Sequence, residues 1–186
     1  QYTRECAERI RTYTNYIDKK KLEVATERQE ELDSLNEMYC NVQQDIDTAM
    51  HFDRRLFEKT REDEDFLHIY LGQGTIASSR PIDYKKQERL EVGDELTEMP
   101  EKIYQLFENI DGAPICSDMK DSNAIGIVGT KEALYGMFKN VVIDIAVRHY
   151  YGDVRLYMLV DDEKRYQWAR FLPHLMNAGG IRNIVF

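Results

Sequence analysis

The sequence contains few cysteines and no long hydrophobic run. Its three cysteines, Cys6, Cys40 and Cys116, lie far apart, and no CxxC pair occurs. This spacing supports neither a disulfide framework nor a zinc site, and it favours a reducing compartment. No stretch approaches the roughly 20 apolar residues that a membrane-spanning helix needs, and no signal-peptide pattern opens the chain. We therefore expect no metal and no membrane span within these 186 residues.

Glycine and proline are absent from the first 71 residues. These two residues usually interrupt helices, and apolar residues recur here at steps of three and four, so the pattern predicts a long amphipathic helix. We expect a break near 39–41, because Asn41 followed by Gln44 has the pattern of a capping box that starts a second helix. Residues 1–60 are thus predicted to form a helical stalk. The chain begins in the middle of the pattern, so we expect it to be part of a longer protein.

Basic side chains are outnumbered by acidic ones. The chain has 25 Lys and Arg against 34 Asp and Glu, and its formal net charge is −9. This balance disfavours binding to nucleic-acid phosphates, so we expect no nucleic-acid partner. Six basic residues near the start would suit the negative inner leaflet of a membrane, or would pair with neighbouring glutamates on a solvated helix, which we favour. They are Arg4, Arg9, Arg11, Lys19, Lys20 and Lys21.

From residue 61 onward, strand patterns alternate with helix patterns. The stretch "DFLHIYLGQG" predicts a strand that ends in a glycine turn, and "TIASSRPIDY" predicts its hairpin partner. Later strands are expected in "APICSDM", "AIGIVG", "DVRLYMLVDD" and "IRNIVF", with "AIGIVG" buried. The intervening helices are expected in "DELTEMPEKIYQLFENIDG", stopped by Gly112, in "KEALYGMFKNVVIDIAVRHYYG", and in "DEKRYQWARFLPHL", ending before Pro173. The alternation predicts an α/β domain over residues 61–186 with a largely parallel sheet.

The junction before the second of these helices is where nucleotide-binding proteins place phosphates. A working phosphate loop reads GxxxxGK[ST]: its amides wrap the phosphates, its lysine reaches the terminal phosphates and its hydroxyl holds magnesium. Here Gly126 and Gly129 are too close together, and Glu132 replaces the hydroxyl residue after Lys131. We therefore favour a structural turn with Thr130 as helix N-cap, and leave a weak anion site at Lys131 as the alternative.

Other candidate residues have simpler explanations. Asp161 stands where a nucleotide hydrolase carries its magnesium-organising acid, but together with Asp162 it is more typical of a helix cap. Trp168 is expected to pack inside the domain, with an exposed interface anchor as the alternative. His174 has no catalytic partner by motif and is expected to be structural, with an interface role as the alternative. No catalytic residue and no metal ligand is predicted, since the histidines lack ligand spacing.

Several segments, in order, resemble one family: the membrane-bound EssC/EccC ATPases of type VII secretion, relatives of the FtsK/SpoIIIE translocases. The segment "RRLFEKTREDEDFLHIYLGQG" is similar to the family's LWER, acidic spacer, DFL, strand and GxG, with Phe57 replacing tryptophan and Lys59 replacing arginine. The strand-helix-strand segment from "IGIVG" to "LYML" and the ending "WARFLPH" also resemble the family. The resemblance covers almost the whole chain.

The resemblance implies a RecA/P-loop-like α/β fold preceded by a long helical stalk. In that family two membrane helices precede the stalk, a degenerate ATPase-like module follows it, and active modules that use ATP and Mg²⁺ come next. This chain would then be a non-catalytic structural and coupling domain at the cytoplasmic face of the bacterial plasma membrane. Its partners would be the membrane helices and ATPase modules of the same chain, other secretion components and further copies of the parent. The alternative is an active nucleotide-binding hydrolase module that uses Lys131 and Asp161.

Overall fold

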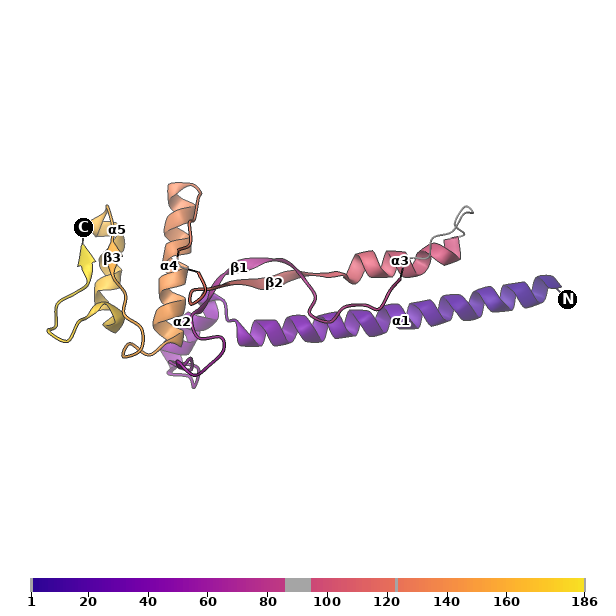
Figure 1. The fold of residues 1–186 in the computed structure, drawn as a ribbon, viewed down its shortest axis with the longest axis horizontal. Coiled ribbons are helices and arrows are strands. Elements are labelled where there is room, and N and C mark those ends of the chain that lie inside the picture. Colours follow the sequence, from indigo (N-terminus) through magenta and orange to yellow (C-terminus); the bar gives the residue numbers. More distant parts are fainter. Residues whose placement is uncertain (1, 86–94, 123, 186) are drawn as a thin grey trace. The chain divides into compact units, whose positions relative to one another are not determined.

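The computed structural model describes residues 2–85, 95–122 and 124–185. Figure 1 shows their elements, which mix helices with short strands and begin with one long helix. In chain order they are α1 (Tyr2–Met38), α2 (Val42–His51), β1 (His68–Ala77), α3 (Glu95–Phe107), β2 (Asn109–Asp118), α4 (Lys131–Arg148), β3 (Met158–Leu159), α5 (Glu163–Tyr166) and β4 (Ile184–Val185). Two 3₁₀ helices, Gln167–Phe171 and Pro173–Leu175, follow α5. The predicted long first helix is confirmed.

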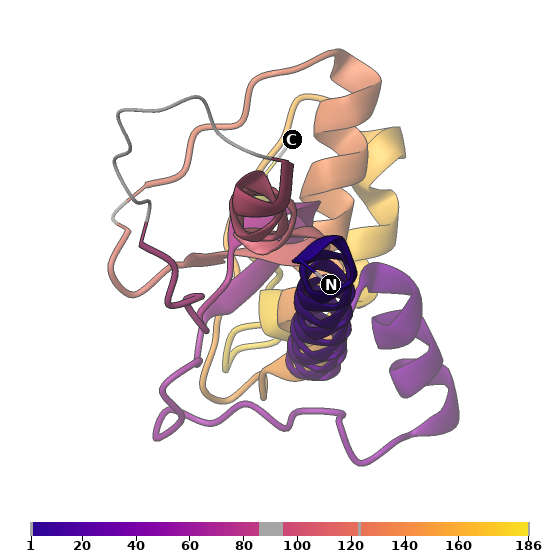
Figure 2. The same ribbon diagram turned by 90° about the vertical axis from the view of Figure 1, so that its right-hand side faces the viewer.

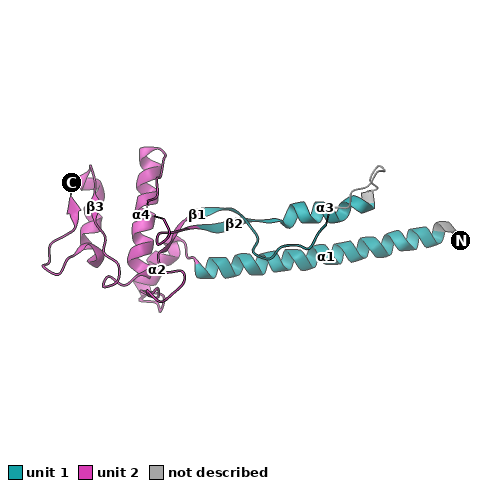
Figure 3. Ribbon diagram, viewed as in Figure 1, with its two compact units in different colours: residues 1–38, 73–115 teal, residues 39–72, 116–186 magenta. Residues whose placement is uncertain are grey.

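The chain divides into two compact units, which Figure 3 colours separately. Unit 1 comprises residues 1–38 and 73–115, and unit 2 comprises residues 39–72 and 116–186. Both strands β1 and β2 therefore contribute residues to each unit. The units reflect contacts within this chain, whereas the predicted division at residue 60 concerns a stalk and a module of the parent protein. That division stays a prediction.

Unit 1 is built on α1, which packs against α3. Figure 2 looks along α1 and shows α3 beside it. Among the described residues of this unit, the buried apolar ones are Ile17 of α1 and Ile110 and Ala113 of β2. Most other side chains of α1 lie on its solvated face, as its charged sequence predicts.

Unit 2 contains α2 packed against α4, and a small sheet at its C-terminal end. Strands β3 and β4 pair in parallel, with Met158 opposite Ile184 and Leu159 opposite Val185. Met158 forms a buried cluster with Ala169 and Leu175. Partly buried apolar residues pack against this cluster: Phe138, Leu156, Val160, Tyr166, Trp168, Leu172 and Ile184. The cluster thus joins α4, the sheet and the 3₁₀ helices into one core.

The sequence pattern correctly predicted how the second helix begins after the break that follows α1. Asn41 is the N-cap of α2, and its side-chain oxygen accepts the amide N–H groups of Gln43 at 3.0 Å and Gln44 at 3.1 Å. The Gln44 side chain accepts the Asn41 amide in return at 2.8 Å. The predicted capping box is therefore confirmed.

The strand predictions need three corrections. The predicted hairpin is wrong, since β1 continues through both glycines of "GQG" and pairs with β2. Gly112 does not stop a helix, because α3 ends at Phe107 and Gly112 lies inside β2 with φ +71°, a conformation that favours glycine. Residues 124–129 form no strand and are exposed. Among the described residues there are two sheets of two strands each, so the larger RecA-like parallel sheet is not confirmed.

Candidate functional site

The candidate phosphate turn is a capped helix start. Thr130 has φ −69° and ψ 156°, and its hydroxyl oxygen accepts the Ala133 amide N–H at 3.3 Å. Residues 124–130 are exposed and form no strand, and the chain bends at Gly129. Glu132 lies in the first turn of α4, where a carboxylate is favourable next to the helix dipole. The N-cap prediction for Thr130 is thereby confirmed.

Neither glycine of the turn has the backbone of a phosphate cradle. A Cβ atom on Gly126 would have no neighbour within 4 Å, and one on Gly129 would meet the Cβ of Ala133 at an ordinary 3.8 Å. Neither residue adopts the left-handed φ that favours glycine. The backbone here does not need glycine, whereas a loop that wraps phosphates depends on glycine's close approach.

The acidic pair after β3 caps the next helix. The Asp162 carboxylate accepts the Arg165 amide N–H at 3.1 Å at the start of α5. Asp161 is exposed beside it. No recorded hydrogen bond or ion pair joins Asp161 to Lys131 within the described part of the chain. The two candidate residues are therefore not assembled into one site.

The two candidate interface residues lie against the core of unit 2. Trp168 is half-buried on the Met158 cluster, and the Lys139 ammonium lies 6.0 Å from its ring centroid. His174 has no exposed surface, and its Nε2–H donates to the His149 carbonyl oxygen at 2.7 Å. Burial lowers the pKa of His174. His174 is therefore an interior residue of unit 2, in keeping with the structural role that its sequence context favours.

A cluster of charged side chains that the sequence analysis did not single out lies between α2 and α4. We call Asp45, Glu58, Asp144 and Arg148 the acid–arginine cluster. Asp45, Asp144 and Arg148 are almost fully buried. The Arg148 guanidinium pairs with the Glu58 carboxylate, and its Nη1 lies 3.9 Å from Asp45 Oδ1. Asp144 Oδ2 accepts the Tyr70 amide N–H at 3.1 Å.

The two aspartates of this cluster, Asp45 and Asp144, hold protons unusually tightly. Burial, reinforced by the neighbouring Asp144 carboxylate and opposed by Arg148, raises the pKa of Asp45 to about 7. Burial likewise raises the pKa of Asp144 to about 6. Groups with such shifts are typical of functional sites when they face a cleft. Here Asp45 is only 1% exposed, so a substrate has no access to it, and we assign the cluster a structural role.

His149 is a buried neutral base next to this cluster. Its Nε2 accepts the Leu67 amide N–H at 3.1 Å. Burial is the main reason that its pKa falls to about 4, so the ring is uncharged at neutral pH. Leu67 has φ +66°, a left-handed conformation that is unusual for a branched residue. The histidine side chain thus satisfies the amide of a strained turn.

Unit 1 has its own buried ion pair, which we call the α1 clamp. Arg28 and Glu31 lie one turn apart on α1, with Arg28 Nη1 3.5 Å from Glu31 Oε2. Arg28 donates to the carbonyl oxygens of Phe107 at 2.7 Å and Arg80 at 2.8 Å. Glu31 accepts the Ser79 amide at 2.7 Å, the Ser79 hydroxyl at 2.6 Å and the hydroxyl of the preceding serine at 2.6 Å. The clamp fastens α1 to two distant segments of unit 1.

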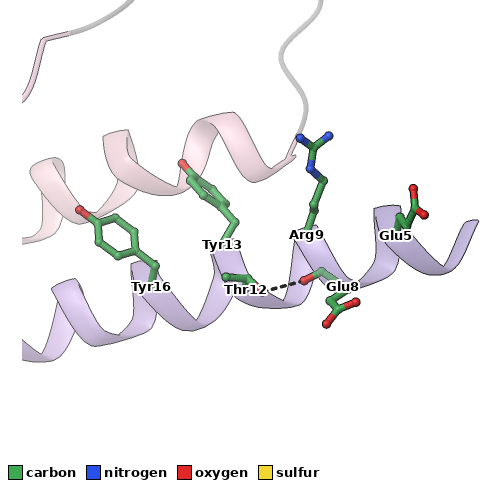
Figure 4. Close-up of a pocket in the computed structure, with 6 residues that line it drawn as sticks. All are labelled: Glu5, Glu8, Arg9, Thr12, Tyr13 and Tyr16. Carbon is green, nitrogen blue, oxygen red and sulfur yellow. Dashed lines mark hydrogen bonds between the residues drawn. The ribbon is translucent and has the colours of Figure 1, made fainter. Parts of the chain in front are cut away.

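A shallow depression runs along the first part of α1 in unit 1. Figure 4 shows that Arg9, Tyr13 and Tyr16 point toward α3, while the Thr12 hydroxyl donates to the Glu8 carbonyl oxygen at 2.9 Å. Glu5 completes the lining. All six lining side chains come from one helix, and they do not converge on a common point as the groups of a catalytic site do. The depression therefore has no convergent set of polar groups that indicates catalysis.

The described residues contain neither a metal-binding cluster nor a helix that could span a membrane. No group of three or more histidine, cysteine or acidic side chains is arranged to hold a metal ion in that part of the chain. None of the helices in the described part of the chain combines the length and apolar character that spanning a bilayer requires.

The spacing of charged residues along the chain gave an indication of both ion clusters. Asp144 and Arg148 lie four residues apart within the otherwise apolar stretch "VVIDIAVRH", and Arg28 and Glu31 lie three apart. Charged residues on an apolar helix face are rarely buried unless they are paired. The partners of these residues are far away in the sequence, so the pattern alone does not identify them.

Comparison with known proteins found relatives along the whole chain. Two type VII secretion system EssC proteins of Staphylococcus aureus, from strains MSSA476 and NCTC 8325 / PS 47, are each 28% identical over 189 residues, which cover 100% of this chain and 13% of theirs. An ESX secretion system protein EccC of Geobacillus thermodenitrificans is 28% identical over 170 residues, covering 89% of this chain and 11% of its own. No protein-family model matches. The chain thus spans about 13% of the length of the EssC relatives, and the resemblance seen in its sequence is confirmed.

Proposed function

We propose that this chain, which is homologous over its whole length to a segment of the type VII secretion proteins EssC and EccC, is a non-catalytic structural and coupling domain. It would link membrane helices to ATPase modules of the same parent protein at the cytoplasmic face of the bacterial plasma membrane. Other secretion components and further copies of the parent are the proposed partners. ATP and Mg²⁺ would act in other modules of the parent.

The observation that carries the proposal is the form of the turn from residue 124 to residue 132. A P-loop nucleotide hydrolase holds its phosphates with wrapped amides, a lysine and a metal-holding hydroxyl in one loop. In this chain the residues before α4 are an exposed segment without strand pairing that ends in the Thr130 cap. The side chain after Lys131 is Glu132, which repels a polyphosphate instead of holding its metal.

Two features support a mechanical role. The first is α1, whose 37 residues span about 55 Å at a rise of about 1.5 Å per residue. The second is the α1 clamp, which fixes α1 within unit 1 through hydrogen bonds to residues roughly 50 to 80 positions away. A long helix that is held at one region transmits a displacement along its axis. We also propose that residues 61–186 form a degenerate ATPase-like domain of the parent protein.

Calorimetric titration of the protein with ATP and Mg²⁺ tests the proposal. We expect no saturable heat at micromolar protein, and the same result with Lys131→Ala. The matched control is Lys164→Ala, which removes an equally exposed lysine from α5. Micromolar binding that is lost in Lys131→Ala but kept in Lys164→Ala would instead support an active nucleotide-binding hydrolase module.

A further inference from the structure

Helix α2 is attached to α4 through a largely polar face. The two helices pack against each other within unit 2 (Figure 3). The buried residues of α2 are Asp45 and Thr48, whereas its apolar residues Val42 and Ile46 are only half-buried. A helix of ten residues is marginal in water unless packing supports it. The attachment of α2 therefore depends strongly on the state of Asp45.

The acid–arginine cluster contains more acidic than basic groups. The carboxyl groups of Asp45, Glu58 and Asp144 surround the Arg148 guanidinium. Because Glu58 pairs with Arg148, the cluster is neutral when both aspartates are protonated. Each proton that the aspartates lose adds a negative charge to the interior, where a charge without a partner is costly.

The Asp45 carboxyl group is poorly placed to carry such a charge. Asp45 is 1% exposed, and neither of its carboxyl oxygens has a hydrogen-bond partner among the described residues. Arg148 Nη1 lies 3.9 Å from Asp45 Oδ1, which is beyond hydrogen-bond distance. Asp144 differs, because its Oδ2 accepts the Tyr70 amide N–H at 3.1 Å. Ionisation of Asp45 is therefore the less compensated of the two.

Helix α4 also has contacts that do not involve α2. Phe138 packs against the Met158 cluster near the C-terminal sheet. Tyr135, one turn earlier, donates its hydroxyl to the Arg165 carbonyl oxygen at 3.1 Å. These contacts hold α4 on the core of unit 2 whether or not α2 is attached. Local opening of α2 therefore leaves that core in place.

We propose that α2 is a proton-dependent latch, which is docked on α4 while Asp45 is protonated and detaches when Asp45 ionises. The groups that face Asp45 are Asp144 and Arg148 of α4, and Glu58 of the segment after α2. Burial raises the pKa of Asp45 to about 7, so docking is favoured below neutral pH and weakens as the pH rises through 7. The latch does not rest on the proposed coupling function.

Amide hydrogen exchange of the full chain, followed by NMR at pH 6 and pH 8, tests the latch. Each rate is divided by the intrinsic rate at the same pH. Because the pKa of Asp45 is about 7 when docked and about 3.8 in water, the detached population should rise about tenfold between these pH values. The protection of the α2 amides should fall by the same factor, while that of Ile145 in α4 stays unchanged.

Two variants separate Asp45 from other titrating groups. Asp45→Asn stays neutral, so the protection of its α2 amides should be the same at pH 6 and pH 8. Asp47→Asn removes an acid from the exposed face of the same helix and is the matched control. It should keep the tenfold change of the original chain. The measurement on the original chain needs no variant, so it stands even if Asp45→Asn folds poorly.

Three outcomes would overturn the proposal. The first is protection of the α2 amides that does not change between pH 6 and pH 8 in the original chain. The second is a tenfold loss that persists in Asp45→Asn. The third is an equal loss at Ile145, which would mean that α4 opens together with α2. None of these outcomes affects the calorimetric titration with ATP, so the two proposals are tested separately.

Discussion

The two units bury charge in different ways. In unit 1, Arg28 and Glu31 are each about 6% exposed, and hydrogen bonds to backbone and serine groups surround their pair. In unit 2, Asp45 is 1% exposed and both of its carboxylate oxygens lack a hydrogen-bond partner. Its charged neighbour Arg148 is engaged with Glu58. One cluster is therefore satisfied, and the other contains an unsatisfied acid.

The difference shows that burial alone does not decide whether a charged group stabilises a fold. A buried ion pair offsets its desolvation cost only when further hydrogen bonds satisfy the remaining atoms. The α1 clamp meets this condition, because backbone and serine groups hydrogen-bond to both members of its ion pair. Asp45 does not, so the folded state favours its neutral, protonated form.

The largest expected effect comes from breaking the satisfied pair. Glu31→Ala leaves the Arg28 guanidinium buried without its carboxylate and removes the acceptor for Ser79. We expect a loss of about 3–5 kcal/mol in the free energy of unfolding, measured by urea denaturation followed by circular dichroism. Glu30→Ala, an exposed neighbour on the same helix, is the control and should change stability little. Equal losses in both variants would contradict a specific role for the clamp.

The next effect concerns the unsatisfied acid and depends on pH. Because the pKa of Asp45 is about 7 in the folded state and about 3.8 when unfolded, the folded state keeps a proton that the unfolded chain releases. Its contribution to stability is complete below pH 4 and is lost as the pH rises through 7. Asp45→Asn stays neutral, so it should gain about 1–3 kcal/mol relative to the original chain between pH 4 and pH 8.

The quantity to compare is the difference in the free energy of unfolding between Asp45→Asn and the original chain at each pH. This difference cancels the contributions of other groups that titrate nearby. Asp144 changes stability in the same direction, and His149, with its pKa lowered to about 4, opposes it below pH 6.5. Glu58 and Arg148 also face Asp45. The control is Asp47→Asn on the exposed face of α2. A flat difference profile for Asp45→Asn would show that folding does not raise the pKa of Asp45.

The smallest expected effect is at Asn41, the half-buried N-cap of α2, whose side-chain oxygen accepts two amide N–H groups. Asn41→Ala removes both side-chain acceptor contacts of the capping box and should cost about 1 kcal/mol by urea denaturation. Thr130→Ala removes a single 3.3 Å contact at the start of α4 and should cost less. The reverse order would contradict the expectation that the two Asn41 side-chain contacts contribute more than the single Thr130 contact.

Features set by short-range signals were predicted well. The continuous α1, the break after it, the capping box at Asn41 and the cap at Thr130 each depend on residues within four positions of one another. The homology of the chain was also visible from ordered motifs. These properties need no knowledge of distant contacts.

Features set by long-range pairing were predicted poorly. Two glycines in "GQG" indicated a turn, yet β1 passes through them because β2, about 40 residues later, supplies its pairing partner. The acid–arginine cluster was missed for the same reason, since Asp45 and Arg148 are about 100 residues apart. The apolar pattern at 124–128 records a preference for a strand, while pairing depends on an edge elsewhere in the chain.

The buried residues of α1 also limit how this helix can change length during evolution. Ile17, Arg28 and Glu31 are spaced so that they share one face of the helix. Each inserted or deleted residue between Ile17 and Arg28 would rotate one anchor by about 100° relative to the other. Gaps of seven or eleven residues, close to whole numbers of turns, would preserve their phase. Relatives of this chain should therefore vary in helix length by such steps, with single-residue gaps confined to positions outside the anchors.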